Sequence, residues 1–120
     1  MNEQQKRILH VEDDTAVQKY ISTLLSSIAV VTPASTLKEA QSLVKDIRYD
    51  LIIIDFTLPD GSGSELIGQL AKQDPTIPII VFSAHDIVNA MVNVKQTFMK
   101  GRYSPKILLD TITKYVKQPM

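Results

Sequence analysis

Four large aliphatic residues in a row, residues 51–54, end directly on the carboxylate of Asp55, and this stretch constrains the fold more than any other. An uninterrupted aliphatic run is typical of a short strand buried on both faces, as in a parallel sheet. The Pro-Asp-Gly turn at residues 59–61 then takes the chain away from the sheet. Asp55 is therefore predicted at the carboxyl end of a buried strand, where open α/β sheets bind ligands. A lone aspartate there could equally cap a turn, so its role depends on its neighbours.

Strand-like and helix-like segments alternate along the whole chain. Short apolar runs predict strands at residues 8–11, 28–32, 51–54, 77–82 and 97–99. Apolar residues at helical spacing predict helices from Thr15 onward, over 36–47, over 62–73 and from Ser104 onward. Residues 86–95 are a poor helix candidate, because they contain asparagines and several valines. This alternation indicates parallel pairing with right-handed crossovers, hence a doubly wound α/β sheet with helices on both faces.

Composition favours one domain over residues 1–120 and disfavours several functions. Thirteen basic and thirteen acidic residues cancel, so no overall charge attracts nucleic acid or an anionic membrane. There is no cysteine for a disulfide, a thiolate nucleophile or a cysteine-bound zinc. No apolar run approaches membrane-spanning length and no leader segment is evident. A cytoplasmic location is the expectation.

Polar side chains follow most of the predicted strands at the point where each strand ends. In chain order they are Glu12, Asp13, Asp14, Asp55, Ser83 and Lys100. Because the carboxyl ends of parallel strands meet at one edge, we expect these side chains to lie together. Crowded carboxylates repel unless a cation compensates them, and Mg²⁺ prefers carboxylate, water and phosphate oxygens. A lysine and a hydroxyl suit a phosphoryl group, so one carboxylate becomes a candidate nucleophile for phosphoryl transfer.

These stretches resemble the receiver domain of two-component response regulators, the CheY-like family. The resemblance covers nearly the whole chain, and it lies in residues 8–14 (ILHVEDD), 51–61 (LIIIDFTLPDG), 80–84 (IVFSA) and 98–100 (FMK). It implies a flavodoxin-like fold of five strand–helix repeats. It also implies that Asp55 accepts a phosphoryl group from a histidine kinase.

The same resemblance assigns roles to the other strand-end residues. Glu12 and Asp13 match the acidic pair that holds Mg²⁺ with Asp55, and Thr57 matches a residue that binds the metal through its backbone carbonyl. Ser83 matches the switch hydroxyl, and Lys100 matches the lysine that pairs with the phosphate. Phosphorylation is then expected to bias a two-state protein-interaction surface.

Three features depart from the family pattern. Lys100 follows Ser83 by only 17 positions, more than a helical turn fewer than in most receivers, so the fourth helix should be short, irregular or absent. Thr97 stands where the family usually has an aromatic switch residue, and the adjacent Phe98 should point to the opposite face. Gly101 follows the lysine in place of the usual proline, so a cis peptide is not expected there.

The leading hypothesis is a phosphoacceptor module that is not an enzyme beyond its own phosphorylation and dephosphorylation. Its expected partners are a sensor histidine kinase or phosphotransfer protein and a downstream protein, without direct nucleic-acid or membrane binding; a homodimer stays open. One alternative is a degenerate receiver that acts as a phosphorylation-independent interaction module. Another is a phosphatase of the haloacid dehalogenase type, but that class uses an Asp-x-Asp pair and this chain has Thr57 at the second position.

Several single residues have simpler interpretations. Asp14 is expected to cap a helix rather than to bind metal directly. His10 lies within a predicted strand and is expected to be a packed or partly exposed residue rather than a phosphohistidine, and His85 is expected in a loop. Residues 61–63 (Gly-Ser-Gly) are interpreted as a turn and helix start, because no Gly-Lys-Ser/Thr follows.

Overall fold

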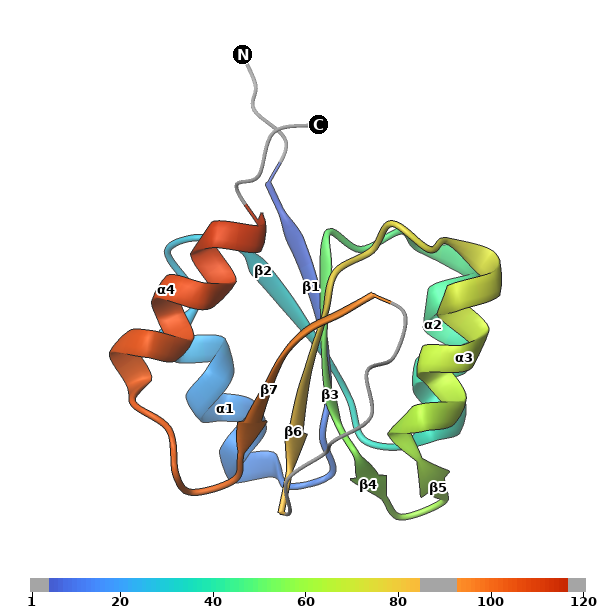
Figure 1. Cartoon of the computed structure of the whole chain (residues 1–120), viewed down its shortest axis with the longest axis horizontal. Helices are drawn as coiled ribbons and strands as arrows, with labels where there is room; N and C mark the ends of the chain where they lie inside the picture. Colours follow the sequence, from blue (N-terminus) through green and yellow to red (C-terminus); the bar gives the residue numbers. More distant parts are fainter. Residues whose placement is uncertain (1–4, 85–92, 117–120) are drawn as a thin grey trace.

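The computed structural model describes residues 5–84 and 93–116, and its centre is a five-stranded parallel sheet (Figure 1). The strands lie in the order β2-β1-β3-β6-β7. Their bounds are β1 Arg7–Val11, β2 Val30–Ala34, β3 Leu51–Asp55, β6 Ile79–Ser83 and β7 Val94–Met99. A separate antiparallel pair, β4 (Thr57–Leu58) and β5 (Gly61–Ser62), lies in the connection after β3. The order confirms the predicted doubly wound, flavodoxin-like sheet, in which β2 is added on one side of β1 and the later strands are added on the other side, beginning with β3.

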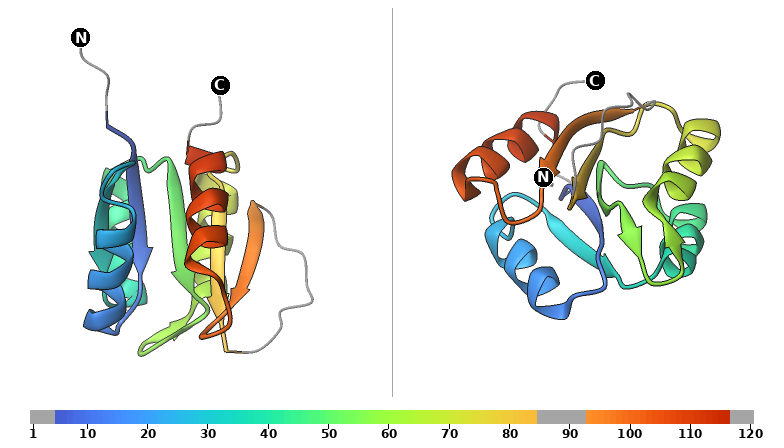
Figure 2. Two further views of the ribbon diagram at one scale, coloured as in Figure 1. Left: turned by 90° about the vertical axis from the view of Figure 1, so that its left-hand side faces the viewer. Right: turned by 60° about the horizontal axis from the view of Figure 1, so that its bottom comes forward.

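Helices cover both faces of the sheet (Figures 1 and 2). The described residues form α1 (Thr15–Leu24) and α4 (Pro105–Val116) on one face, and α2 (Leu37–Asp46) and α3 (Gly63–Gln73) on the other. Each pair of helices closes its own core cluster against the sheet. β3 lies between the two clusters, and all five of its residues are buried, as the aliphatic run predicts. None of these helices is long and apolar enough to cross a membrane.

Capping side chains fix where the helices begin. Asp14 is the N-cap of α1 and accepts hydrogen bonds from two backbone N–H groups of its first turn. Thr36 caps α2, and Ser62 with Glu65 forms a complete capping box at the start of α3. Ser104 accepts a hydrogen bond from the first turn of α4. These caps satisfy N–H groups that would otherwise lack partners. The Asp14 cap also holds the last residue of the loop after β1, residues 12–14, against the start of α1.

The predicted bounds of three strands were wrong, and one of these strands, β6, begins at Ile79 instead of residue 77 and ends at Ser83. β2 begins at Val30 and runs through Pro33 to Ala34, instead of covering 28–32. Pro33 fits because β2 is an edge strand of the described sheet, where one side needs no N–H donor. β7 begins at Val94, so the end of the segment 86–95 is strand rather than helix. Residues 85–92 lie outside the described residues, and the prediction of a short, irregular or absent fourth helix falls on them. The β4–β5 hairpin was not predicted.

Two large apolar residues at helical spacing are exposed rather than buried. Tyr20 of α1 is 42% exposed and Ile107 of α4 is 58% exposed. Their neighbours Ile21 and Leu108 are the residues that meet the sheet. Each helix touches only one face of the sheet, so only a narrow stripe of its surface is buried. Neighbouring residues in a helix differ by about 100° around its axis, so the residue next to a buried one can lie outside this stripe.

Candidate functional site

The strand order brings the predicted site residues to one edge of the sheet. Glu12 and Asp13 follow β1, Asp55 ends β3, Ser83 ends β6 and Lys100 follows β7. β1 pairs with β3, β3 with β6 and β6 with β7, so these ends are neighbours along the carboxyl edge, at the bottom of Figure 1. Reasoning from strand ends alone therefore predicted their juxtaposition.

Three carboxylates form a compact group at this edge. One carboxylate oxygen from each of Glu12, Asp13 and Asp55 lies within 4.8 Å of the others. Glu12 and Asp55 are each 3% exposed, whereas Asp13 is open to solvent. Hard divalent cations such as Mg²⁺ take a few carboxylate oxygens and keep water on the remaining positions. Two buried carboxylates and one exposed carboxylate fit that requirement, and the open side would admit water or phosphate oxygens.

Lys100 is the counter-charge of this group. Its Nζ lies 2.5 Å from Oδ2 of Asp55 and 3.8 Å from Oε1 of Glu12. Although partial burial disfavours its charged form, the hydrogen bond to Asp55 and the nearby carboxylates raise the pKa of Lys100 above its usual value. One ammonium cannot balance three carboxylates. Desolvation and the charge of Asp55 accordingly raise the pKa of Glu12, against the opposing backbone hydrogen bond from Asp14 and the charge of Lys100.

The end of β3 is held from two sides. Asp55 Oδ1 accepts a hydrogen bond from the backbone N–H of Thr57 at 3.1 Å. A Cβ on Gly63, the first residue of α3, would lie 2.7 Å from the carbonyl oxygen of Asp55, and the Gly63 N–H donates to the Phe56 carbonyl at 2.7 Å. Helix α3 therefore begins against the Asp55 backbone because residue 63 lacks a side chain. The part of Thr57 in metal binding, through its carbonyl, stays a prediction.

Ser83 and Lys100 belong to one hydrogen-bonded frame. The Lys100 N–H donates to the Ser83 carbonyl at 2.8 Å, so β6 and β7 end together. Ser83 is 6% exposed. Thr97 pairs with Val81, and Phe98 points to the other face, where its ring stacks on Phe82 with 5.7 Å between centroids. As the sequence predicts, position 97 of β7 carries no aromatic ring, and the ring of Phe98 lies on the opposite face of the sheet.

His10 is a packed residue, one of the two alternatives that the sequence predicts. It is 1% exposed, and its Nδ1 has no hydrogen-bond partner among residues 5–84 and 93–116. Burial, together with the Lys100 charge, lowers its pKa from 6.5 to about 4, so the side chain is neutral at pH 7. A histidine between two aliphatic strand residues gives no signal that distinguishes this state from a half-exposed one.

Asp14 serves as the N-cap of α1, and its N–H donates to Glu12 Oε2 at 3.0 Å. This confirms its interpretation as a helix cap. Beside the carboxylates lies a hollow of about 360 Å³, which Lys100 and Tyr103 also line. The carboxyl edge thus combines charge, burial and an opening to solvent.

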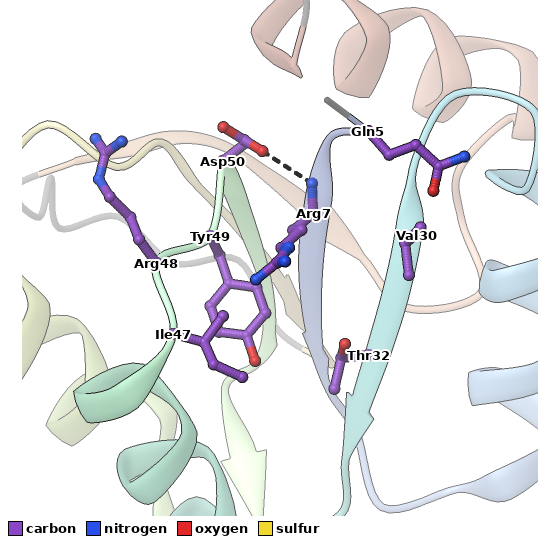
Figure 3. A pocket seen from close by; sticks show the side chains of 8 residues that line it. All are labelled: Gln5, Arg7, Val30, Thr32, Ile47, Arg48, Tyr49 and Asp50. Carbon is purple, nitrogen blue, oxygen red and sulfur yellow. Dashed lines mark hydrogen bonds between the residues drawn. The ribbon is translucent and has the colours of Figure 1, made fainter. Parts of the chain in front are cut away.

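A larger hollow of about 880 Å³ lies at the opposite, amino edge of the sheet (Figure 3). Its charged groups are largely satisfied within the protein. Asp50 accepts the Arg7 backbone N–H at 2.8 Å, and Arg48 pairs with Asp74 at 2.9 Å. The ring of Tyr49 lies at its floor, with its hydroxyl directed toward Thr32 (Figure 3). Size alone therefore does not make this groove the better candidate.

Comparison with known proteins gives consistent matches. A family model described as the response regulator receiver domain matches residues 8–117. The transcriptional regulatory protein PmrA of Pectobacterium parmentieri is 33% identical over 88 residues, which are 72% of this chain and 40% of PmrA. The chemotaxis protein CheY of Thermotoga maritima is 25% identical over 118 residues, which are 93% of this chain and 98% of CheY. The chain thus spans less than half of PmrA and nearly all of CheY.

A solved structure shows the same likeness in three dimensions. The CheY-like response regulator receiver domain protein from Methanospirillum hungatei matches with a TM-score of 0.86 and 26% identity, and the match covers 96% of each chain.

Proposed function

We propose that this chain, which belongs to the response regulator receiver domain family, accepts a phosphoryl group on Asp55. The observation that carries the proposal is the group of Glu12, Asp13 and Asp55 carboxylates with Lys100 bonded to Asp55. Two-component signalling is the class of function that this family serves, and the geometry supports a phosphoacceptor within it.

In the proposed reaction an Asp55 carboxylate oxygen attacks phosphorus, an acyl–phosphate bond forms, and the bond from phosphorus to the donor breaks. With a phosphohistidine donor the leaving group is its imidazole nitrogen, and the electron pair of the broken bond stays on that nitrogen. Glu12, Asp13 and Asp55 would hold Mg²⁺, which offsets the charge of the phosphoryl oxygens when bound. Burial of Glu12 and Asp55 removes competing water, so the remaining charges act more strongly.

Lys100 and Ser83 would serve the phosphorylated state. Lys100 now bonds Asp55 Oδ2, so a phosphoryl group there would give the ammonium a new, more highly charged partner. A hydroxyl at Ser83, at the end of the neighbouring strand, would donate to another phosphoryl oxygen. Because the Lys100 N–H is bonded to the Ser83 carbonyl, a shift of either residue would move the ends of β6 and β7 together.

The proposed partners follow from this chemistry. A sensor histidine kinase or phosphotransfer protein would present the donor, and a downstream protein would bind the altered β6–β7 end. A cytoplasmic location, a role as acceptor rather than enzyme, and the absence of direct nucleic-acid binding belong to the same proposal. The family's relatives include a transcriptional regulatory protein, PmrA, that is longer than this chain.

A second candidate is a receiver that binds partners without phosphorylation. The residue that favours it is Thr97, which provides no aromatic side chain on a strand that ends at the site. The intact group of carboxylates argues against it, because crowded like charges are unfavourable and phosphorylation-independent binding does not require them.

The test is phosphorylation of purified protein by acetyl phosphate, with and without Mg²⁺, followed by intact mass. We expect a gain of one phosphoryl group that requires Mg²⁺ and disappears in Asp55→Asn. Asp50→Asn, a change at the amino edge, is the matched control and should be phosphorylated like the wild type. A folded wild-type protein that gains no phosphoryl group would overturn the proposal in favour of the second candidate.

A further inference from the structure

We infer that Gln18 is a positioning residue that holds the acidic loop, residues 12–14, in its cation-binding arrangement before a cation enters. The inference rests on the proposed Mg²⁺-dependent function, and it assigns a role to a residue outside the carboxylate group. Gln18 is the fourth residue of α1 and is half-buried.

The side-chain amide of Gln18 bridges two loops at the carboxyl edge. Its Nε2 donates to the backbone carbonyl of Glu12 at 2.5 Å and to the Ser35 hydroxyl at 3.1 Å. Both partners are acceptors, so both amide hydrogens are used. Glu12 belongs to the loop after β1 and Ser35 to the loop after β2, so one side chain fixes the two loops to each other and to α1.

Other hydrogen bonds complete the restraint on Glu12. Its backbone N–H donates to the Ala34 carbonyl at 2.8 Å, and its Oε2 accepts the Asp14 N–H at 3.0 Å. Gln18 is therefore the contact that satisfies the Glu12 carbonyl from the helix side. On the far side, the Ser35 N–H donates to Glu39 of α2 at 2.8 Å, which ties Ser35 to a second helix.

The acidic loop needs such a restraint because its charges repel. Glu12 and Asp55 are both buried, Asp13 lies beside them, and Lys100 compensates only part of their charge. Without a cation, the favourable response of a loose loop is to carry Glu12 and Asp13 away from Asp55. Hydrogen bonds to backbone atoms resist that movement without adding charge. A loop that is already in place loses less conformational freedom when a cation binds, so its affinity is higher.

The inference makes a selective prediction for Gln18→Met, which keeps the length of the side chain but removes the amide. The Mg²⁺ dissociation constant of the unphosphorylated protein should rise about tenfold. The amide hydrogen of Asp14, bonded within the loop, should exchange faster in the metal-free protein. Phosphorylation at saturating Mg²⁺ should stay near the wild-type rate, because Gln18 touches none of the reacting atoms.

The matched control is Gln73→Met. Gln73 Nε2 donates to the Val44 carbonyl at 2.6 Å, the same kind of bond between α3 and α2, away from the carboxylates. This variant should lose a similar amount of thermal stability and keep the wild-type Mg²⁺ dissociation constant. If Gln18 had only a structural role, the two variants would have the same Mg²⁺ dissociation constant as well as a similar thermal stability.

The experiment titrates MgCl₂ into ¹⁵N-labelled wild type, Gln18→Met and Gln73→Met, following the Asp13 and Asp14 amide signals, and measures hydrogen exchange without metal. A wild type that binds Mg²⁺ with a Gln18→Met variant of equal affinity and equal exchange would overturn the Gln18 inference alone. A wild type that shows no Mg²⁺-dependent shift would overturn the proposed metal function, and the inference with it.

Discussion

The two edges of the sheet treat carboxylates in opposite ways. At the carboxyl edge, Glu12, Asp13 and Asp55 share the single ammonium of Lys100. At the amino edge, Asp74 has its own partners: the Arg48 guanidinium at 2.9 Å, and the hydroxyl and N–H of Thr76 at 2.6 and 3.1 Å. Asp50 likewise accepts the Arg7 N–H. One edge concentrates negative charge and the other neutralises it.

The pKa shifts of Glu12 at the carboxyl edge and Asp74 at the amino edge have opposite directions. Burial and the charge of Asp55 raise the pKa of Glu12, so its ionised form is unfavourable in the folded protein. The Thr76 hydroxyl and Arg48 lower the pKa of Asp74, so its ionised form stabilises the fold above the unfolded value of 3.8, and that contribution is lost as pH falls through the lower folded value. Carboxylates that lower the stability of the fold indicate a role in binding or catalysis. Carboxylates whose charge is balanced by partners indicate a structural role.

The largest expected effect concerns His10, which lies beneath the carboxyl edge. Its pKa in the folded protein, about 4, is below its unfolded value of 6.5. The contribution of neutral His10 to the free energy of unfolding is therefore fully present above pH 6.5 and is lost as the pH falls toward 4. The difference between the two pKa values corresponds to about 3 kcal/mol. Urea unfolding of wild type and His10→Leu between pH 7 and pH 4 measures it. We expect the wild type to lose about that much more stability, whereas parallel pH profiles would show that His10 does not resist protonation.

The next effect tests how closely α3 approaches Asp55. Gly63→Ala places a Cβ 2.7 Å from the Asp55 carbonyl oxygen and 2.7 Å from Ile54, so we expect a loss of about 2 kcal/mol and slower phosphorylation. Gly68→Ala in the same helix is the control, because a Cβ there meets nothing within 4 Å among the described atoms. That change should stabilise by up to about 1 kcal/mol through helix propensity. Equal effects of the two substitutions, measured by urea unfolding, would exclude the close approach.

A matched pair of charge removals tests the comparison itself. Asp13→Asn removes one of the crowded charges, so the metal-free protein should melt at a higher temperature. Asp74→Asn removes a satisfied charge and should lower stability, by less than about 1 kcal/mol because the Arg48 side chain is largely exposed. Thermal melting of both variants in chelator measures the signs. Destabilisation by Asp13→Asn would contradict the idea of strained charge at the carboxyl edge.

The smallest expected effect lies at the amino edge. Tyr49 is 1% exposed, and its hydroxyl has no hydrogen-bond partner in the part of the chain that the structure describes. Burial raises the pKa of Tyr49, while Thr32 and the Arg7 charge oppose the rise. Tyr49→Phe should therefore be neutral or stabilise by up to about 1 kcal/mol. A clear loss of stability on urea unfolding would mean that the hydroxyl has a partner, such as the Thr32 side chain toward which it is directed.

Local sequence signals were sufficient for the framework of the fold. The aliphatic run that ends on Asp55 gave the central strand, and the capping residues Thr36 and Ser62 gave the helix starts, because these signals act within a few residues. Strand ends then placed the carboxylates together. By contrast, Pro33 can belong to β2 because β2 is an edge strand of the described sheet. Val94 belongs to β7 because it pairs with Ile79 of β6. Such outcomes depend on neighbours distant in sequence.

The supporting residues of the site were beyond local prediction for the same reason. Gln18 gains its role from two acceptors on separate loops, and no motif in α1 marks it. Gly63 was assigned to a turn and helix start, while its close approach to Asp55 follows only from the packing of α3 on β3. Strand-end residues are therefore easier to predict than the residues that hold them.

The most direct test of this account is the effect of Mg²⁺ on unfolding free energy in wild type, Asp13→Asn and Asp50→Asn. Metal that binds the carboxyl edge should stabilise the wild type and Asp50→Asn alike, by about 2.7 kcal/mol at a hundred times the dissociation constant. Asp13→Asn, already relieved of one charge, should lose most of that gain. If Mg²⁺ stabilised all three proteins equally, or stabilised none of them, the result would contradict the claim that repulsion among the carboxylates at this edge is relieved by a bound cation.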